Sequence, residues 1–504
     1  MANTNRTKAT IKNTLWSFLQ QLIVCILSFA SRKVMVWAIG LDGVGLNGLF
    51  SNVLTLLALA ELGVGSAIIY HLFAPIARDD REEICALMNF YKTAYRYIAG
   101  AITVIGLAVI PLLPYIIKGV EFSNSYIIVI YLLFLLQTVS SYFFSYKRSI
   151  LTAMQKQYLF TVLDIVFKII TVVVGMIVLW LTKSFVAYLV VLIVLGVLNN
   201  MAISRRVDKL YPYINEKRKI DNAKKKSIFK NVKDIFVGRI SWKITSSTDN
   251  ILISALVGTI PLGLYTNYTI VINTVTNMIE QFANALSGSL GDLLVREDAQ
   301  HVEKVFGRLC FLMFFAASFI SSCLMCLLNP FVKLWLGEEF LIAAVIVAVC
   351  VLNVYLSTMR VPLWRMLNVS GLFQKDKYIS ITGTVINLIV SFYLGMRVGM
   401  VGILIGTSCT IGIQYILKTA LFYREFLHMS SYRAYVRFGA YTALAIAETA
   451  AAYFLCAMVS IPNEYLAFGA KLLVAAILPL AANIIIFHRN KTFLYYLSLL
   501  KKKL

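Results

Sequence analysis

The chain has 504 residues, of which 60% are hydrophobic and only 14% are charged, and its mean hydropathy is +0.79. A soluble protein of this length needs far more charge to cover its surface, so the composition excludes a string of ordinary soluble domains. The formal net charge is nevertheless +23, from 47 Lys and Arg against 24 Asp and Glu. An apolar chain with this cationic excess is typical of a multi-pass membrane protein whose basic residues lie on one side of the bilayer.

Apolar stretches of roughly 20 residues or more recur along the chain, each long enough to cross about 30 Å of hydrocarbon. We therefore predict an all-α integral membrane fold with about fourteen transmembrane helices. In chain order the predicted spans are 14–40, 46–73, 89–117, 123–146, 158–181, 184–203, 233–258, 262–290, 306–329, 340–364, 378–396, 399–423, 434–458 and 464–487. The four histidines form no cluster, and the sequence predicts no metal site.

The distribution of positive charge predicts the topology. With the N-terminus in the cytoplasm, the inner segments hold 35 Lys and Arg, and the outer loops hold only Lys118, Lys183, Lys333 and Arg397. The positive-inside rule then places both termini in the cytoplasm. The outer loops are all too short for a catalytic domain, which argues against an enzyme. The longest linker, 204–232, is basic and predicted to be cytoplasmic, where it would attract anionic lipid rather than nucleic acid.

An internal repeat crosses this linker at an offset of 218 residues, which places Gly40 on Gly258 and Gly45 on Gly263. Six helices per copy give both copies the same orientation, related by an axis along the membrane normal, with the substrate route between them. The predicted domains are a first six-helix lobe at 1–203, the basic linker at 204–232, a second six-helix lobe at 233–423, and an additional two-helix hairpin with a basic tail at 424–504.

Ionisable residues inside spans are costly, so each is a candidate for function. Arg32 lies on a polar face of span 14–40, and the 218-residue offset places that face in register with the face of span 233–258 that carries Arg239 and Lys243. We interpret these equivalent cationic faces as lining a central cavity. Structural pairing with neighbouring helices is the alternative. Arg360 lies in register with polar residues of span 340–364 and is a further candidate.

An amide-rich stripe marks span 262–290. Amide side chains offer both donors and acceptors to sugar hydroxyls, and they suit hydrogen bonding between helices equally well. The predicted substrate-binding residues are Arg32, Arg239, Lys243, Arg360, Asn273, Asn277 and Asn284.

The carboxylates inside spans are fewer than the cations. Asp164 and Lys168 are four residues apart on one helix, and we expect them to neutralise one another. We expect Asp249 to pair with Arg32 or Lys33. The candidate ion-coupling residues are Asp164, Asp249 and Glu280. Because cations outnumber carboxylates on the polar faces, the sequence favours an anionic cargo such as a phosphate or pyrophosphate.

The layout of two six-helix repeats plus a hairpin resembles the multidrug/oligosaccharidyl-lipid/polysaccharide exporter superfamily. Trp37-Ala38-Ile39-Gly40, Gly43-Val44-Gly45-Leu46 and the run from Leu59 to Ile68 are similar to the glycine-rich turn and following "ELG-G-A" run of its polysaccharide-repeat flippase branch. The resemblance implies a flippase that moves undecaprenyl-pyrophosphate-linked sugar repeats to the outer leaflet for capsule or O-antigen-type polymers.

From this resemblance we expect a bacterial cytoplasmic membrane protein that works as a monomer and needs no cofactor beyond a coupling proton or sodium ion. Its expected partners are the lipid-linked sugar pyrophosphate, membrane lipids and polysaccharide-assembly proteins. Two other transport functions stay open, namely multidrug efflux by cation antiport and translocation of the peptidoglycan lipid precursor. The multidrug branch leads one to expect an acidic residue in the first helix, where this chain has Arg32 and Lys33.

Overall fold

The computed structural model describes residues 2–58, 64–216, 218–221, 225–226, 228, 247–370 and 372–501. Across these residues the secondary structure is helical, without a strand, so the predicted all-α fold is confirmed. In the same part of the chain eleven helices are long and apolar enough to cross a membrane. The count of fourteen spans and the predicted domain limits stay predictions. By its contacts the chain divides into two compact units, 1–266 and 267–504, hereafter the first and second units.

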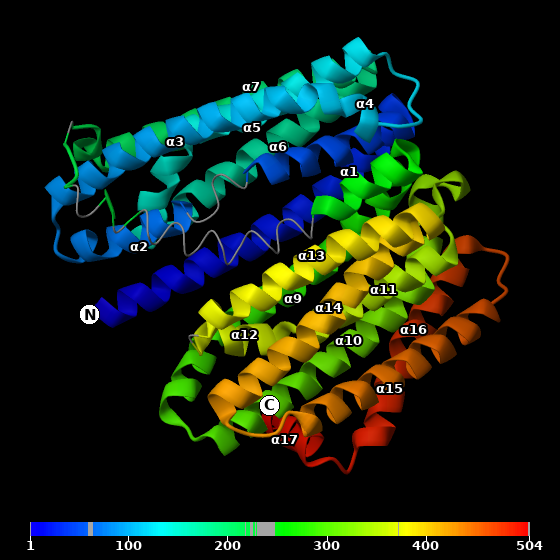
Figure 1. Ribbon diagram of the computed structural model, residues 1–504. Helices are drawn as coiled ribbons and strands as arrows, with labels where there is room; N and C mark the ends of the chain where they lie inside the picture. Colours follow the sequence, from blue (N-terminus) through cyan, green and yellow to red (C-terminus); the bar gives the residue numbers. More distant parts are fainter. Residues whose placement is uncertain are drawn as a thin grey trace. The chain divides into compact units, whose positions relative to one another are not determined.

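In the described part of the first unit, Figure 1 labels the helices α1 to α7. These are α1 (Ala2–Leu57), α2 (Val64–Ala77), α3 (Arg81–Val109), α4 (Leu113–Ile116), α5 (Asn124–Ala153), α6 (Tyr158–Thr182) and α7 (Phe185–Leu210). α5 packs against α3 and α7, and α6 packs against α1 and α7. Side-chain oxygens of Asp80, Ser123 and Ser184 accept hydrogen bonds from the first turns of α3, α5 and α7. These caps satisfy backbone groups that the helix itself leaves unpaired and so fix where each helix begins.

Two glycines that the repeat pairs both interrupt helical geometry. Gly40, inside α1, has φ 65° and ψ −175°, and Gly258, just before α9 (Thr259–Arg296), has φ 134° and ψ 159°. Only glycine adopts these angles without steric cost. Each glycine therefore ends one helical segment and lets the next begin at once, at Leu41 and Thr259.

The segments that begin at Leu41 and Thr259 cross with their backbones in contact. A Cβ atom added to Gly45 would lie 2.2 Å from the Thr259 carbonyl oxygen, and one added to Gly263 would lie 2.6 Å from the Leu41 carbonyl oxygen. Because the offset of 218 pairs Leu41 with Thr259 and Gly45 with Gly263, the two contacts are reciprocal. Small residues allow this close approach, as is common where membrane helices cross.

The second unit holds the rest of α9, which begins in the first unit, and the helices that follow it (Figure 1). These are α10 (Ala299–Leu336), α11 (Ala344–Met359), α12 (Val361–Val369), α13 (Phe373–Val398), α14 (Met400–Phe422), α15 (Tyr432–Ala457), α16 (Glu464–Phe487) and α17 (Lys491–Lys501). α14 packs against α13 and α11, and α10 packs against α11. α15 and α16 form a helical hairpin, and both of its helices pack on α10.

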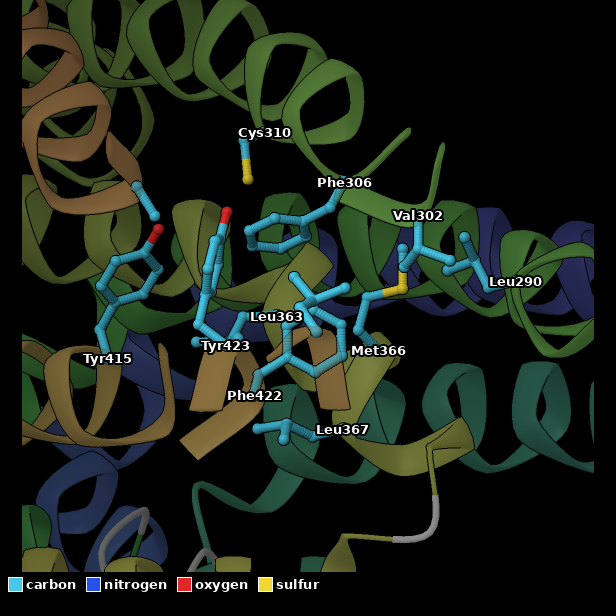
Figure 2. Close-up of a cluster of buried hydrophobic side chains, with 12 residues drawn as sticks. Leu290, Val302, Phe306, Cys310, Leu363, Met366, Leu367, Tyr415, Phe422 and Tyr423 are labelled. Carbon is cyan, nitrogen blue, oxygen red and sulfur yellow. The ribbon is translucent and has the colours of Figure 1, made fainter. Parts of the chain in front are cut away.

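A buried cluster fixes the short helix α12 within the second unit. Figure 2 shows Leu363 and Met366 of α12 among Phe306 of α10 and Phe422 and Tyr423 at the end of α14. Leu363, Met366 and Phe306 are fully buried. Positions 363, 366 and 367 form one helical face, so the other faces of α12 are left to carry polar residues. The cluster thereby sets the position of Arg360, Trp364 and Arg365.

Candidate functional site

Asp164 and Asp208, two carboxylates among the described residues of the first unit, are bound to cations. Lys147 of α5 is buried, and its Nζ donates to both carboxylate oxygens of Asp208 on α7 at 2.7 Å and to Ser204 Oγ at 2.8 Å. Each of the two charges is thus offset by the other, as burial in a low-dielectric medium requires. This pair ties α5 to α7, and we assign it a structural role.

The expected pairing of Asp164 with Lys168 is wrong. Asp164 of α6 instead accepts a two-point hydrogen bond from Arg148 of α5, with N–O distances of 2.8 and 2.9 Å. Asn199 Nδ2 adds a third hydrogen bond to this carboxylate at 2.8 Å. The guanidinium fork matches the two carboxylate oxygens, whereas a lysine four residues along the same helix offers one point charge. Arg148 is therefore a paired residue and not a cation that merely reaches the membrane surface.

Lys168 is left without an ion pair among the described residues of the chain. At helical spacing around it, Ile165, Val172 and Gly175 are buried, which puts Lys168 on the packed face of α6. Its own side chain is nevertheless exposed. A lysine on a packed face that has no counter-ion is able to bind an anion.

Arg32 of α1 is another cation of the first unit to which the described part of the chain offers no ion pair. Its side chain is half-buried, and its Nη1 donates a hydrogen bond to Thr266 Oγ1 at 3.4 Å. The neighbouring Lys33 is exposed. Among the described residues, this one long hydrogen bond engages only one of the five donors of the guanidinium.

In the second unit, two cations lie against one indole ring. Arg360 Cζ is 5.1 Å and Lys418 Nζ is 4.0 Å from the centre of the Trp364 ring, within the range of cation–π attraction. Lys418 of α14, only 1% exposed, also lies 2.7 Å from Asp376 of α13. Arg360 makes no salt bridge with any described residue. The group therefore keeps one excess positive charge, on Arg360.

Glu280, a candidate for ion coupling, is bound to an arginine. The carboxylate of Glu280, on α9, accepts a hydrogen bond from Arg365, on α12. Arg360 makes no salt bridge with Glu280 among the described residues. The carboxylate therefore offsets the charge of Arg365.

The amide stripe of α9 is partly open. Asn273 and Asn277 are exposed, and their side chains make no hydrogen bond within the described part of the chain. The side chain of Asn284 lies outside the described residues. Asn353 of α11, by contrast, bonds to α14, donating to the Leu404 carbonyl at 3.0 Å. Two of the three candidate amides thus remain available to a ligand.

Three other predicted site residues cannot be placed in the same way. Arg239 and Lys243 lie outside the described residues. Asp249 is half-buried in the short apolar helix Ser247–Val257, and its pairing with Arg32 or Lys33 stays a prediction. The sequence analysis missed Lys418 and Trp364. Lys418 lies inside predicted span 399–423, and a lysine inside a span is a signal of function. Because Lys418 is near the end of that span, it was counted among the charges of the inner loop.

An apolar groove of about 420 Å³ opens between α10, α11 and α15 of the second unit. Its walls include Met325, Val351, Leu352, Ile446 and Phe454. Ile446 and Phe454 are exposed large apolar side chains. A groove of this composition accepts a hydrocarbon chain and offers little to a charged group.

Comparison with known proteins gives one family match and several structural ones. The profile of a family described as polysaccharide biosynthesis protein matches residues 10–290. No curated protein matches the sequence. In structure the chain is similar to an inward-facing multidrug resistance transporter of the MATE family in the MOP superfamily, with a TM-score of 0.66 and 15% identity, over 80% of this chain and 97% of that one.

Two further solved structures have the same fold. The lipid II flippase MurJ in an inward closed conformation gives a TM-score of 0.64 at 14% identity, over 93% of this chain and 99% of that one. A MOP superfamily transporter from Pyrococcus furiosus is described as having a binding pocket of reverse polarity. It gives a TM-score of 0.56 at 14% identity, over 82% of this chain and 95% of that one. At these identities the likeness establishes the fold, which is that of the MOP superfamily transporters.

Proposed function

The chain belongs to the polysaccharide biosynthesis protein family, and from this premise we propose that it is a flippase for undecaprenyl-pyrophosphate-linked oligosaccharide repeat units. It would move the sugar-bearing headgroup across the bacterial cytoplasmic membrane for capsule or O-antigen-type polysaccharide export. Both termini would face the cytoplasm. Transport makes and breaks no covalent bond, so the proposed activity is not enzymatic.

The observation that carries this proposal is the sorting of charges. Asp164, Asp208 and Glu280 are each bound to a cation, whereas Arg32, Lys168 and Arg360 make no salt bridge among the described residues. Uncompensated charge is costly in the membrane, so an intramembrane cation without a counter-ion is best explained by an anionic ligand. A pyrophosphate supplies several oxygens in a geometry that suits the arginine fork.

The other parts of such a ligand also find suitable groups. The open amides of Asn273 and Asn277 suit sugar hydroxyls. The apolar groove between α10, α11 and α15 would hold part of the polyprenyl chain. Polar and apolar portions of the proposed cargo thus have different places to bind, as an amphipathic lipid requires.

The proposed mechanism is alternating access, in which Arg32, Arg239, Lys243 and Arg360 replace the water around the headgroup. No resident cofactor is proposed. Direction would come from a proton or sodium gradient, or from removal of the product outside. Asp164, Asp249 and Glu280 stay candidates for the coupling ion. A proton arriving at Asp164 or Glu280 would weaken its bond to Arg148 or Arg365. The other proposed partners are membrane lipids and polysaccharide-assembly proteins, with a monomer as the working unit.

Two other transport functions have an observation in their favour. The likeness to a multidrug transporter favours drug efflux, and the likeness to the lipid II flippase favours a peptidoglycan precursor as cargo. The alignment with the multidrug transporter includes 97% of that protein but only 80% of this chain. The alignment with the lipid II flippase includes 93% of this chain. The additional length of this chain therefore has a counterpart in a lipid flippase, which supports a lipid-linked cargo.

Binding of a lipid-linked sugar pyrophosphate to the purified protein, with the uncharged polyprenol as control, tests the proposal. Arg32→Gln and Arg360→Gln should each remove a hydrogen bond to a charged group, worth about 1.5–3 kcal/mol, which weakens binding roughly tenfold to a hundredfold. Lysine at either position should restore binding only in part. Arg397→Gln, at the far end of α13, is the matched control and should bind as the wild type does.

Equal affinity for the two lipids would contradict an anionic cargo and favour drug efflux. Cargo identity needs a second comparison, between a sugar-repeat lipid and the peptidoglycan precursor. Preferential binding of the precursor would transfer the proposal to that substrate without changing the role of the arginines.

A further inference from the structure

A buried carboxyl group lies where the C-terminal hairpin meets the rest of the second unit, apart from the cations described above. Glu448 of α15 is only 4% exposed, Ser318 of α10 is fully buried, and Asn483 of α16 is 1% exposed. Ser318 Oγ donates a hydrogen bond to Glu448 Oε2, and Asn483 Nδ2 donates to the same oxygen at 3.2 Å. One carboxyl oxygen thus joins three helices (Figure 1 shows α10, α15 and α16).

Two acceptor atoms of this group have no donor among the described residues. Glu448 Oε1 and Asn483 Oδ1 are both buried and make no hydrogen bond with that part of the chain. A buried acceptor without a donor is costly, and two within a single cluster indicate that a donor or a cation is missing. A proton on Glu448 Oε1 would convert one of these acceptors into a donor.

Among the described residues, Glu448 makes no salt bridge that would stabilise its ionised form. One turn before it, Ala445 belongs to an apolar cluster with Phe314 and Tyr355, and one turn after it, Ala452 belongs to another. An ionised carboxylate in such a setting would bear most of its desolvation cost uncompensated.

The titratable groups on the packed helices are distant or neutral. From α11, the Tyr355 hydroxyl donates to Thr442 at 3.2 Å. α10 presents Cys323, α15 carries Arg437, Tyr441 and the exposed Tyr453, and α16 carries Lys471. His488, just past the end of α16, is exposed, and its Nδ1 lies 2.8 Å from the Ile485 carbonyl oxygen. Lys471 and Arg437 are 12 and 11 residues from Asn483 and Glu448, which is roughly 16–18 Å along a helix. None of them supplies the missing donor.

We propose that Glu448 is a proton-binding site that holds the α15–α16 hairpin on α10. In the packed state Glu448 carries a proton on Oε1 and accepts from Ser318 and Asn483 on Oε2. Loss of the proton leaves a buried, unpaired carboxylate and loosens the contact of the hairpin with α10. The proposal concerns the hairpin contact and holds whatever the cargo is.

Infrared spectroscopy of the full-length protein in bilayers tests this site directly. The wild type should have a protonated-carboxyl C=O band that Glu448→Gln lacks, and that the exposed control Glu339→Gln retains. Absence of the band at neutral pH would overturn the proposal. Should Glu448→Gln fail to fold, Asn483→Leu provides the second test. It keeps the carboxyl but removes a donor and an acceptor, and it should shift the band to higher wavenumber. An unshifted band would contradict the assigned contact.

Thermal unfolding of the same proteins provides the second readout. Because the folded state binds a proton that the unfolded state releases, wild-type stability should fall as pH rises, by up to tenfold in the folding equilibrium per pH unit. Glu448→Gln, whose amide keeps a donor in place, should lose this part of the pH dependence, and Glu339→Gln should retain it. Identical profiles for wild type and Glu448→Gln would overturn the proton site. Stabilisation by sodium at constant pH, abolished in Glu448→Gln, would replace the proton with a metal cation and would also overturn it.

Discussion

A charged side chain inside a membrane protein has two fates in this molecule. Where a carboxylate from a neighbouring helix reaches it, as Asp208 reaches Lys147 and Asp164 reaches Arg148, the pair ties two helices together. Where none does among the described residues, as for Arg32, the cation makes only a hydrogen bond, to Thr266, and we propose that it binds an anionic ligand. Hydrogen-bond geometry decides between the two, because a carboxylate within reach of the cation offsets its charge.

Arg148→Met should destabilise the first unit, because it strips Asp164 of its two-point partner and leaves a carboxylate that is largely buried. Breaking one side of such a pair costs about 3–5 kcal/mol, whereas replacing both sides by apolar groups is often neutral. We expect the amount of folded protein in membranes to fall for Arg148→Met and for Asp164→Asn, and to recover in Arg148→Met/Asp164→Asn.

Lys168→Met is the matched control for that experiment. It removes a cation from the same helix as Asp164, but one that makes no salt bridge with it among the described residues. Lys168→Met should therefore leave protein levels near those of the wild type, and it should not rescue Asp164→Asn. If Lys168→Met rescued Asp164→Asn and Arg148→Met did not, the result would favour the Asp164–Lys168 pair expected from the sequence.

At the scale of helices, the crossing of the segments that begin at Leu41 and Thr259 depends on having no side chain in the way. A Cβ atom added at Gly45 would meet the Thr259 carbonyl oxygen, which cannot move without disturbing its own helix. A Cβ atom added at Gly48 would lie 2.7 Å from the methyl carbon of Thr266, and the next atom would be 3.8 Å away. The two glycines therefore differ in whether a second substitution can make room.

Gly48→Ala should destabilise the protein by about 1–3 kcal/mol, as overpacking does, and Thr266→Ser should relieve most of it by removing the obstructing methyl group. The serine keeps the hydroxyl that accepts from Arg32 and donates to the Gly263 carbonyl at 2.8 Å. Thermal unfolding of the purified variants provides the measurement.

Two comparisons make this test specific to the crossing. Gly45→Ala should be at least as harmful, and Thr266→Ser should not rescue it. Gly100→Ala, on α3 where an added Cβ meets nothing within 4 Å, should be neutral or slightly stabilising, because alanine favours helix. Equal effects at positions 48 and 100 would contradict a close crossing.

At the scale of the molecule, segments predicted to face the outside lie together in each unit. In the first unit, the backbone N–H of Thr259 donates to the Lys118 carbonyl at 3.0 Å. In the second, Lys333 Nζ is 2.9 Å from Glu464 Oε1 and also pairs with Glu338. Its hydrogen bond to Glu338 lowers the pKa of that exposed carboxyl below the usual value. These contacts agree with the charge-derived topology, which assigns all these residues to one side.

Cysteine labelling tests that topology in the whole cell. In a variant without the eight native cysteines, a cysteine at Asp221 in the basic linker should resist an impermeant reagent added outside intact cells. Cysteines at Glu339 and Ser460, both exposed in the structure, should react. Lysed cells provide the control, in which all three positions should be labelled. The reverse pattern in intact cells would invert the assignment.

The sequence by itself determined the fold class, since the length of the apolar runs and the composition leave no alternative to a bundle of membrane helices. It also indicated the repeat, because glycines at turns and close crossings recur at a constant offset and only glycine suits those backbones. Arg32 and Arg360 were recognisable as candidates because a charge inside an apolar run is visible without coordinates.

Only the tertiary structure decided which charges are paired. Asp164 has Lys168 four residues away on its own helix, yet it binds Arg148, because packing of α5 on α6 brings a two-point donor within reach. Lys418 and Trp364 are 54 residues apart in the chain but 4.0 Å apart in space. Helical periodicity fixes the face on which a residue lies, but it carries no information about which helix comes to pack against that face.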